Sequence, residues 1–137
     1  MPVLKKIPTD LEILNTIYRL YYSDFVAFDD DDDERTRDSK VYVPIDCVRI
    51  ANELKVDRDI VFGRLYSHLN NLYSYEQGNI KLFTSVHGEN LRCIHFPLMS
   101  SVLASLRQER GKFLISTLIA SLALIISLIS LVFSISK

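Results

Sequence analysis

One stretch of this sequence, residues 113–136, contains no charged side chain and also lacks histidine, asparagine, glutamine, proline and glycine. Of its 24 residues, 15 are leucine, isoleucine, valine or phenylalanine. As a helix it would be about 36 Å long, and the hydrocarbon core of a membrane is about 30 Å thick. The alternative is the core helix of a soluble domain, but about 110 other residues are too few to wrap a helix that is apolar on every side. The sequence therefore predicts one transmembrane helix.

Signatures of catalysis and of cofactor binding are also missing. The sequence holds no nucleophile–base pair of recognised spacing, no glycine-rich phosphate loop and no metal-ligand spacing. The histidines at 68, 87 and 95 are isolated. Cys47 and Cys93 are too few and too far apart for a disulfide framework, so we interpret them as small buried thiols. We predict that the protein is not an enzyme and that it carries no cofactor or metal.

An N-terminal signal peptide is not visible either, because residues 1–8 are short, basic and interrupted by proline. Basic residues flank the apolar stretch unequally, with Arg107, Arg110 and Lys112 before it and Lys137 after it. The positive-inside rule places the more basic flank in the cytoplasm. We therefore predict a single-pass membrane protein whose N-terminal domain is cytoplasmic.

The most strongly charged segment is Asp29 to Glu34, six consecutive acidic residues within a wholly polar stretch, residues 29–40. Like charges at this density repel one another, so we predict a mobile loop. The alternatives are a cation site and a mimic of nucleic acid. Metal-binding loops, however, space their acids with turn residues, and this run lacks that spacing.

The rest of the sequence predicts one α+β domain over residues 10–110, after an N-terminal tail at 1–9 and before a C-terminal anchor at 111–137. Thr9 and Glu12 have the spacing of a capping box, which predicts a first helix from Asp10 to about Ser23. Two more helices are expected at Ile45–Leu54 and from Arg58 to about Tyr73, the latter capped by Asp57 and with Val61, Leu65, Leu69 and Leu72 as its apolar stripe.

Short β-prone runs separate these helices. Val41–Val43 is one, and Ile80–Val86 and Leu91–Phe96 form a hairpin signal around the turn residues 87–90. A fourth helix is predicted from Pro97 to about Arg110. Its inward residues would be Leu98, Val102, Leu103 and Leu106. Gly111 would then be a flexible joint before the apolar stretch.

This order of helix, short strand, helix-turn-helix, hairpin and helix resembles the winged helix-turn-helix family over about residues 10–110. The core of the resemblance is Ile50–Leu65, where Ala51 supplies a small residue at the helix contact and where Leu54, Val56, Val61 and Leu65 would fill the shared core. The family usually has glycine at the tight turn, and Lys55 stands there in this sequence. Lysine can adopt the left-handed conformation at a cost of about 1 kcal/mol. A three-helix bundle without the motif is the alternative.

The resemblance implies DNA binding, with the third helix in a major groove and the hairpin as a wing on the backbone. The residues it assigns to this binding face are Lys55, Arg58, Phe62, Arg64, Tyr66, Lys81 and Arg92. Asp57 and Asp59 would repel phosphate there, and Phe62 offers apolar area suited to a protein. We predict a protein that binds DNA at the inner membrane face as a regulator. An adaptor that binds a protein through the same face and a membrane effector controlled by its soluble domain remain alternatives.

Small residues follow one stripe of the apolar stretch, at Ser116, Ala120, Ala123, Ser127, Ser130 and Ser134. Their spacing alternates between four and three residues, as in a heptad. Small side chains let two helices approach closely in a membrane, which predicts a homo-oligomer. The alternative is that serine is simply tolerated in a very hydrophobic helix.

Overall fold

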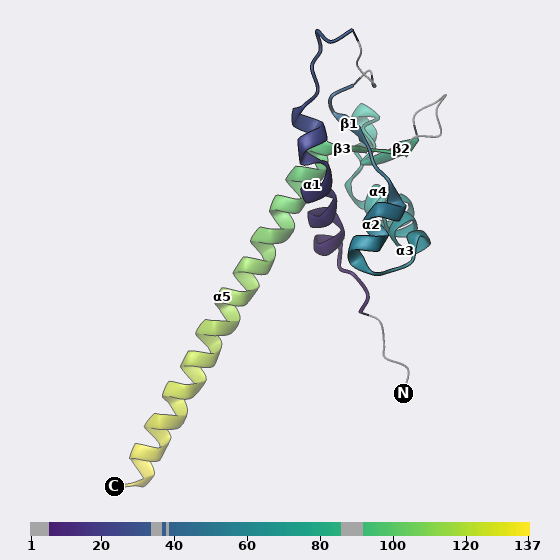
Figure 1. The fold of residues 1–137 in the computed structure, drawn as a ribbon. Helices are drawn as coiled ribbons and strands as arrows, with labels where there is room; N and C mark the ends of the chain where they lie inside the picture. The colour runs from purple at the N-terminus through teal and green to yellow at the C-terminus, as the bar shows by residue number, and fades with distance from the viewer. Residues whose placement is uncertain (1–5, 34–36, 38, 86–91) are drawn as a thin grey trace. The chain divides into compact units, whose positions relative to one another are not determined.

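The computed structural model of the chain describes residues 6–33, 37, 39–85 and 92–137. It divides into two compact units, Met1–Leu103 and Ala104–Lys137. The described residues form one three-stranded antiparallel sheet and four principal helices (Figure 1). The third of these helices consists of the consecutive segments α3, η1 and α4. The predicted mixture of α and β structure is therefore confirmed, and the last helix is long and apolar.

Helix α1 spans Asp10–Val26 and begins at the predicted capping box. The Thr9 hydroxyl accepts a hydrogen bond from the Glu12 N–H at 3.1 Å, and the Glu12 carboxylate accepts one from the Thr9 N–H at 2.8 Å. These bonds satisfy N–H groups near the helix start that have no partner within the helix. The helix runs three residues beyond the predicted end at Ser23. Its inward side chains are Ile13, Leu14, Ile17 and Tyr21.

Helix α2 spans Cys47–Leu54 and is fixed at both ends. The Asp46 carboxylate accepts a hydrogen bond from the Val48 N–H at 2.8 Å, so the helix starts two residues later than predicted. The Asp46 N–H donates to the Tyr21 hydroxyl at 2.8 Å, which ties α2 to α1. Lys55 ends the helix with φ 57° and ψ 40°. The expectation that lysine takes the left-handed conformation at this turn is confirmed.

The third helix has the predicted bounds but three segments, α3 (Arg58–Gly63), the π-helix η1 (Arg64–Leu69) and α4 (Asn70–Tyr73). Its buried side chains include Val61, Leu65 and Leu69, as predicted. Leu72, predicted for the same stripe, is instead 58% exposed. A π-helix places one extra residue in the turn, so the inward position after η1 moves from 72 to 73. This phase shift explains the wrong prediction for Leu72.

The sheet has the order β1-β3-β2, with β1 at Tyr42–Pro44, β2 at Phe83–Ser85 and β3 at Arg92–His95. Both pairings are antiparallel, and Ile94 of β3 lies between Val43 and Phe83. The three predicted strands are confirmed, the first shifted by one residue to include Pro44 and the other two shorter than predicted. The predicted turn at 87–90 lies outside the described residues. The described residues between 29 and 40 contain no helix or strand, as expected for the acidic loop. A 3₁₀ turn, η2 (Glu76–Gly78), precedes β2.

Helix α5 spans Phe96–Ile135 without interruption. At its start, His95 Nδ1 accepts a hydrogen bond from the Leu98 N–H at 3.1 Å. Leu98 and Leu106, both predicted to face inward, are only partly buried. The buried side chains of the helix are Phe96, Met99, Val102 and Leu103. The helix also continues through Gly111, where we predicted a joint, because one glycine costs a helix only about 1 kcal/mol.

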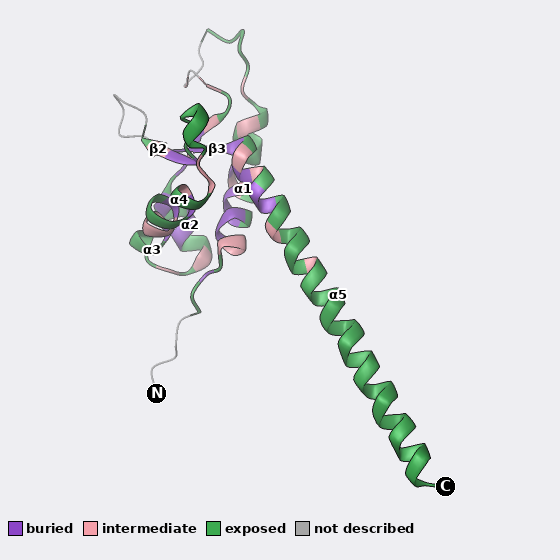
Figure 2. Cartoon of the chain, turned by 180° about the vertical axis from the view of Figure 1, so that it is seen from behind, coloured by how far each residue is buried: buried purple, intermediate pink, exposed green. Residues whose placement is uncertain are grey.

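Among the described residues, α5 is the one helix that is long and apolar enough to cross a membrane. None of its most apolar window is buried, and Figure 2 shows this part of the helix as exposed. The alternative of a buried core helix is therefore contradicted. A helix that exposes apolar side chains on every side is compatible with membrane association.

Candidate binding surface

The seven residues predicted for the binding face do not all lie together. They are Lys55 in the turn before the third helix, Arg58 and Phe62 on α3, Arg64 and Tyr66 on η1, Lys81 just before β2, and Arg92 at the start of β3. Ring contacts and a shared pocket join Phe62, Tyr66, Lys81 and Arg92. Lys55 and Arg58 are exposed near the beginning of the third helix. Arg64 takes a different direction, described below.

Phe62, Tyr66, Phe83 and Arg92 form a cluster that we call the aromatic cluster. The rings of Phe62 and Tyr66, four residues apart on the helix, stack with centroids 5.5 Å apart. Phe83 of β2 meets Phe62 edge-on at 5.9 Å, and the Arg92 guanidinium carbon lies 4.0 Å from the Phe62 ring centroid. Tyr66 is 58% exposed. The cluster therefore presents an aromatic ring and a cation side by side.

The two cysteines take no part in this surface. Cys47 and Cys93 are both buried and unpaired, which confirms the prediction of small buried thiols. Burial raises the pKa of the Cys47 thiol, while the nearby Arg92 acts in the opposite direction. Burial also raises the pKa of Cys93. Both thiols are therefore neutral near pH 7, and neutral thiols are poor nucleophiles.

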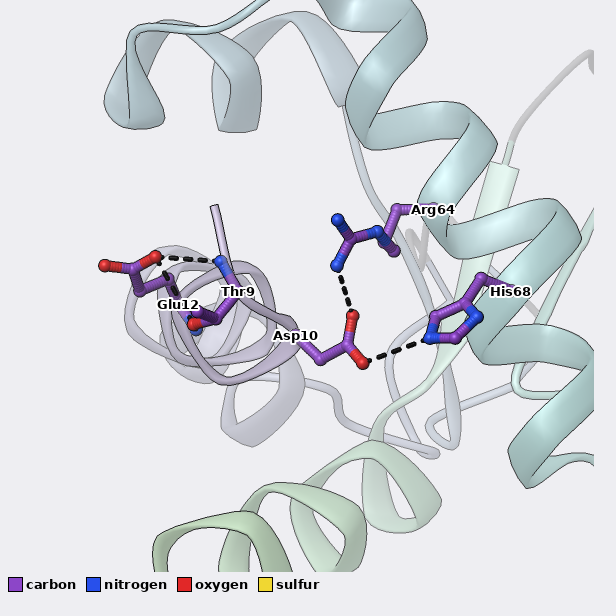
Figure 3. A network of polar contacts seen from close by, with 5 residues as sticks. All are labelled: Thr9, Asp10, Glu12, Arg64 and His68. Carbon is purple, nitrogen blue, oxygen red and sulfur yellow. Dashed lines mark hydrogen bonds and ion pairs between the residues drawn. The ribbon is translucent and has the colours of Figure 1, made fainter. Parts of the chain in front are cut away.

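Arg64 and His68 point toward helix α1 (Figure 3). The Arg64 guanidinium donates a hydrogen bond from Nη1 to Asp10 Oδ1 at 2.6 Å, and His68 Nε2 lies 3.2 Å from Asp10 Oδ2. The Arg64 side chain is 25% exposed. One of the seven predicted residues is thus engaged inside the domain. Sequence reasoning missed Asp10 because a partner 54 positions away has no local signal.

An open pocket of about 630 Å³, which we call the groove, lies between the third helix and β2. Its walls contain Tyr66, Ser67, Asn70 and Asn71 from the helix, Phe83, Thr84 and Ser85 from the strand, and Ser74, Glu76 and Lys81 from the connection between them. The groove joins the aromatic cluster at Tyr66 and Phe83. Seven of its ten lining residues carry an amide or hydroxyl group beside apolar surface, which suits ligands that combine hydrogen-bonding and apolar groups.

Asn70 holds the helical wall of the groove to the strand. Its side-chain oxygen accepts hydrogen bonds from the Phe83 N–H at 3.1 Å and from the Ser74 hydroxyl at 2.7 Å. The Ser74 oxygen accepts a third bond, from the Leu82 N–H at 3.1 Å. Two backbone donors, one just before β2 and one at its first residue, are thereby satisfied by side chains. Sequence reasoning missed this pair, since asparagine and serine near a helix end more often suggest capping.

The predicted binding face carries few positive charges that are not balanced by nearby acids. Arg58 Nε lies 3.4 Å from Asp59 Oδ1, and both side chains are exposed, so the attraction is weak. Asp57 faces the helix start, where its carboxylate accepts a hydrogen bond from the Asp59 N–H at 2.8 Å. The ion pairs among the described residues do not include Lys81 or Arg92. Within the described part of the chain, Lys81 at the groove, Arg92 at the aromatic cluster and Lys55 in the turn before the third helix are therefore free of ion pairs.

The six small residues of the predicted association stripe lie on the exposed part of α5. The Ser127 hydroxyl donates a hydrogen bond to the Ala123 carbonyl at 2.9 Å. Thr117 and Ser121 make the same bond to the carbonyl four residues earlier. Hydroxyls bonded within their own helix lose little in an apolar environment, so they also fit the alternative of tolerated serine. Association along the stripe stays a prediction.

Comparison with known proteins adds no relative to this description. No protein-family model matches the chain, and neither a curated protein nor a solved structure matches it. The resemblance to winged-helix proteins therefore depends on the order of the elements and on the residues of Ile50–Leu65. Within the described part of the chain, no group of three or more histidine, cysteine, aspartate or glutamate side chains could hold a metal ion.

Proposed function

We propose that this chain is a membrane-anchored adaptor with a winged-helix domain, and that the aromatic cluster binds a protein partner. The observation that carries the proposal is the stack of Phe62 and Tyr66 beneath Arg92 on an exposed face. Tyrosine and arginine are enriched where protein interfaces bind most strongly. The cluster is also held in place by the edge-on contact with Phe83, so little order has to be gained on binding.

The same geometry argues for protein over duplex DNA. A winged-helix reader needs cations along its third helix to meet phosphates. Arg64 and His68, which could have served there, are engaged with Asp10. Asp57 and Asp59 lie at the start of the helix and would repel phosphate. The remaining face is aromatic and nearly balanced in charge.

The anchor in this proposal is the apolar part of α5. Its support is the exposure of the whole apolar window together with a length that suits a bilayer. The three basic residues before the window, against one after it, orient the N-terminal domain toward the cytoplasm. Protease added outside intact cells should then leave that domain uncut. Cleavage of the domain from outside would reverse the orientation.

Site-specific cross-linking tests the partner proposal. A photo-reactive phenylalanine analogue would replace Tyr66 in the full chain in its membrane, and Tyr22 would be replaced as the matched control. Both tyrosines are exposed, at 58% and 47%. We expect a protein adduct at Tyr66 that survives nuclease treatment and is absent at Tyr22. Equal adducts at both positions, or an adduct that nuclease removes, would overturn the proposal.

Duplex DNA is the second candidate, and the exposure of Arg58 favours it. This side chain is 60% exposed in the first turn of the third helix, three residues after the exposed Lys55. If that end enters a major groove, Arg58→Ala should weaken specific binding by about 1–3 kcal/mol. Binding should also fall steeply with salt, unlike binding to a protein partner. Measurements with the full chain at several salt concentrations separate the two candidates.

Self-association through the small-residue stripe completes the proposal. A pair of anchors would hold two adaptor domains at high effective concentration and strengthen binding to a partner with two sites. The support is the continuity of the stripe from Ser116 to Ser134.

A further inference from the structure

Among the residues that the structure describes, no strand pairs with the outer edge of β2. β2 is an edge strand, because the sheet order is β1-β3-β2. The Leu82 carbonyl accepts a hydrogen bond from the His95 N–H at 2.8 Å, so this carbonyl points toward β3. Backbone groups alternate in direction along an antiparallel strand, so Thr84 also faces β3. Phe83 and Ser85 therefore direct their N–H and carbonyl groups away from the sheet.

The bond to Asn70 confirms this direction for Phe83, since its N–H donates to a side chain of the third helix. Asn70 thus satisfies the first outward donor of the strand. Ser85 lies two residues farther on and also lines the groove. Among the described residues, no hydrogen bond outside the strand pairings uses the Ser85 N–H or the Phe83 carbonyl. These two groups have the spacing that an added strand uses.

The charge around the groove selects among peptides. Lys81 lines it, and Arg92 pairs with Ser85 across the sheet. Neither cation has an ion-pair partner among the described residues, while Glu76 is the one acidic residue in the lining. The exposed Tyr66 ring offers an apolar contact at the same groove. An extended segment with acidic side chains complements this surface.

We infer that the groove binds an extended acidic peptide, which adds to the edge of β2 through the Ser85 N–H and the Phe83 carbonyl. Main-chain hydrogen bonds supply affinity in this mode, and side-chain pockets supply specificity. Acidic side chains of the peptide face Lys81 and Arg92, and an apolar one lies on Tyr66. This inference rests on the proposed adaptor function and identifies the chemistry of its partner.

The test uses the full chain in lipid nanodiscs and labelled peptides of alternating threonine and valine. One peptide carries glutamates at its ends, a second carries lysines there, and a third is the acidic peptide with N-methylated backbone. Fluorescence anisotropy would measure dissociation constants up to about 1 mM. We expect the acidic peptide to bind about tenfold more tightly than the lysine peptide at low salt. The N-methylated peptide should bind about threefold to tenfold more weakly than its parent.

Two substitutions at one position isolate the strand addition. Ser85→Pro removes an outward N–H, and edge strands tolerate proline, whereas Ser85→Ala keeps this N–H. We expect the proline variant to lose about threefold to tenfold in affinity and the alanine variant to match the parent chain. Equal affinities for all three peptides, or no binding at all, would overturn the inference even if Ser85→Pro did not fold. A protein adduct at Tyr66 alongside such a result would leave the adaptor function standing, so the two failures are distinguishable.

Discussion

Arg64 donates a hydrogen bond of 2.6 Å to Asp10, and this contact fastens the third helix to the first turn of α1 (Figure 3). Asp10 also lies at a helix start, where a negative charge is favourable, and its second oxygen lies 3.2 Å from His68. One carboxylate therefore joins two elements that are far apart in the sequence. The contact gives Arg64 a structural role.

Replacing Arg64 should therefore reduce stability more than binding. Arg64→Ala leaves the partly buried Asp10 carboxylate without its closest donor and should lower the free energy of unfolding by about 1–3 kcal/mol. Arg58→Ala, on the same helix but exposed, should change it by less than about 0.5 kcal/mol. Thermal unfolding followed by the near-ultraviolet signal of the seven tyrosines would measure both. A loss of cross-linking at Tyr66 in a stable Arg64→Ala variant would instead place Arg64 in the interface.

Leu65 and Leu72 provide a matched test of the phase of the third helix. Leu65 is fully buried and Leu72 is 58% exposed. Leu65→Ala should lower the free energy of unfolding by about 2–5 kcal/mol, because it leaves a cavity. Leu72→Ala should change it by less than about 0.5 kcal/mol. Equal losses in denaturant unfolding would mean that the inward stripe continues to Leu72, as the sequence alone suggested.

His95 should make the start of α5 sensitive to acid. Burial lowers the pKa of His95, and its Nδ1 accepts a hydrogen bond from the Leu98 N–H that a protonated ring cannot accept. Because the folded-state pKa is below the unfolded value of about 6.5, the stabilisation is complete above about pH 6.5 and is lost as pH falls toward the lowered pKa. The loss should approach about 1 kcal/mol, as for a helix cap.

The control for this prediction is His95→Asn, whose side-chain oxygen can still accept the bond but does not titrate in this range. All other titratable groups are common to the two proteins, so the difference in their pH dependence reports His95. Melting temperatures of the two proteins should be measured from about pH 7.5 to about pH 5.5. As the pH falls, the parent chain should lose more stability than His95→Asn, so that the difference between their melting temperatures shifts in favour of the variant. Parallel curves would show that His95 keeps its bond throughout.

Helix ends were predictable where the signal is local. Thr9 and Glu12 marked the start of α1, and Asp57 marked the start of the third helix, because a capping residue contacts N–H groups only two or three positions away. The left-handed Lys55 followed from the tight turn that the helix-turn-helix resemblance implies. Hydrophobic period likewise located Val61, Leu65 and Leu69 in the core.

The parts that sequence could not predict depend on contacts across the fold. The winged-helix resemblance assigned Arg64 to the binding face, and the structure shows its guanidinium bonded to Asp10 of α1, a contact that has no local signal in the sequence. The structural role of Asn70 likewise depends on the fold, because β2 places the Phe83 N–H beside its side-chain oxygen. Four of the seven predicted surface residues meet in the aromatic cluster and groove, since the helix period and the hairpin position them together.

Two substitutions in α5 provide a matched test of self-association through this helix. Ala123 lies on the small-residue stripe and Ile125 lies off it, facing another side of the helix. Ala123→Ile should separate two packed helices and weaken association, whereas Ile125→Ala should have little effect. Energy transfer between labelled full-length chains in lipid vesicles would compare them. Similar behaviour of the two variants would make the stripe incidental.

The π-helix η1 predicts that the third helix tolerates the deletion of one residue. In it the Asn70 N–H donates to the Leu65 carbonyl, five positions back, where an α-helix would use four. Deleting the exposed Ser67 would let this segment form a regular α-helix, while the side chains of Phe62 and Asn70 keep their directions around the helix axis. The same deletion in a regular helix, such as Asn52 in α2, would rotate all later side chains by about 100°. The third helix therefore contains one residue more than its register needs. A one-residue insertion that the helix absorbed without disturbing either flank would leave the same geometry.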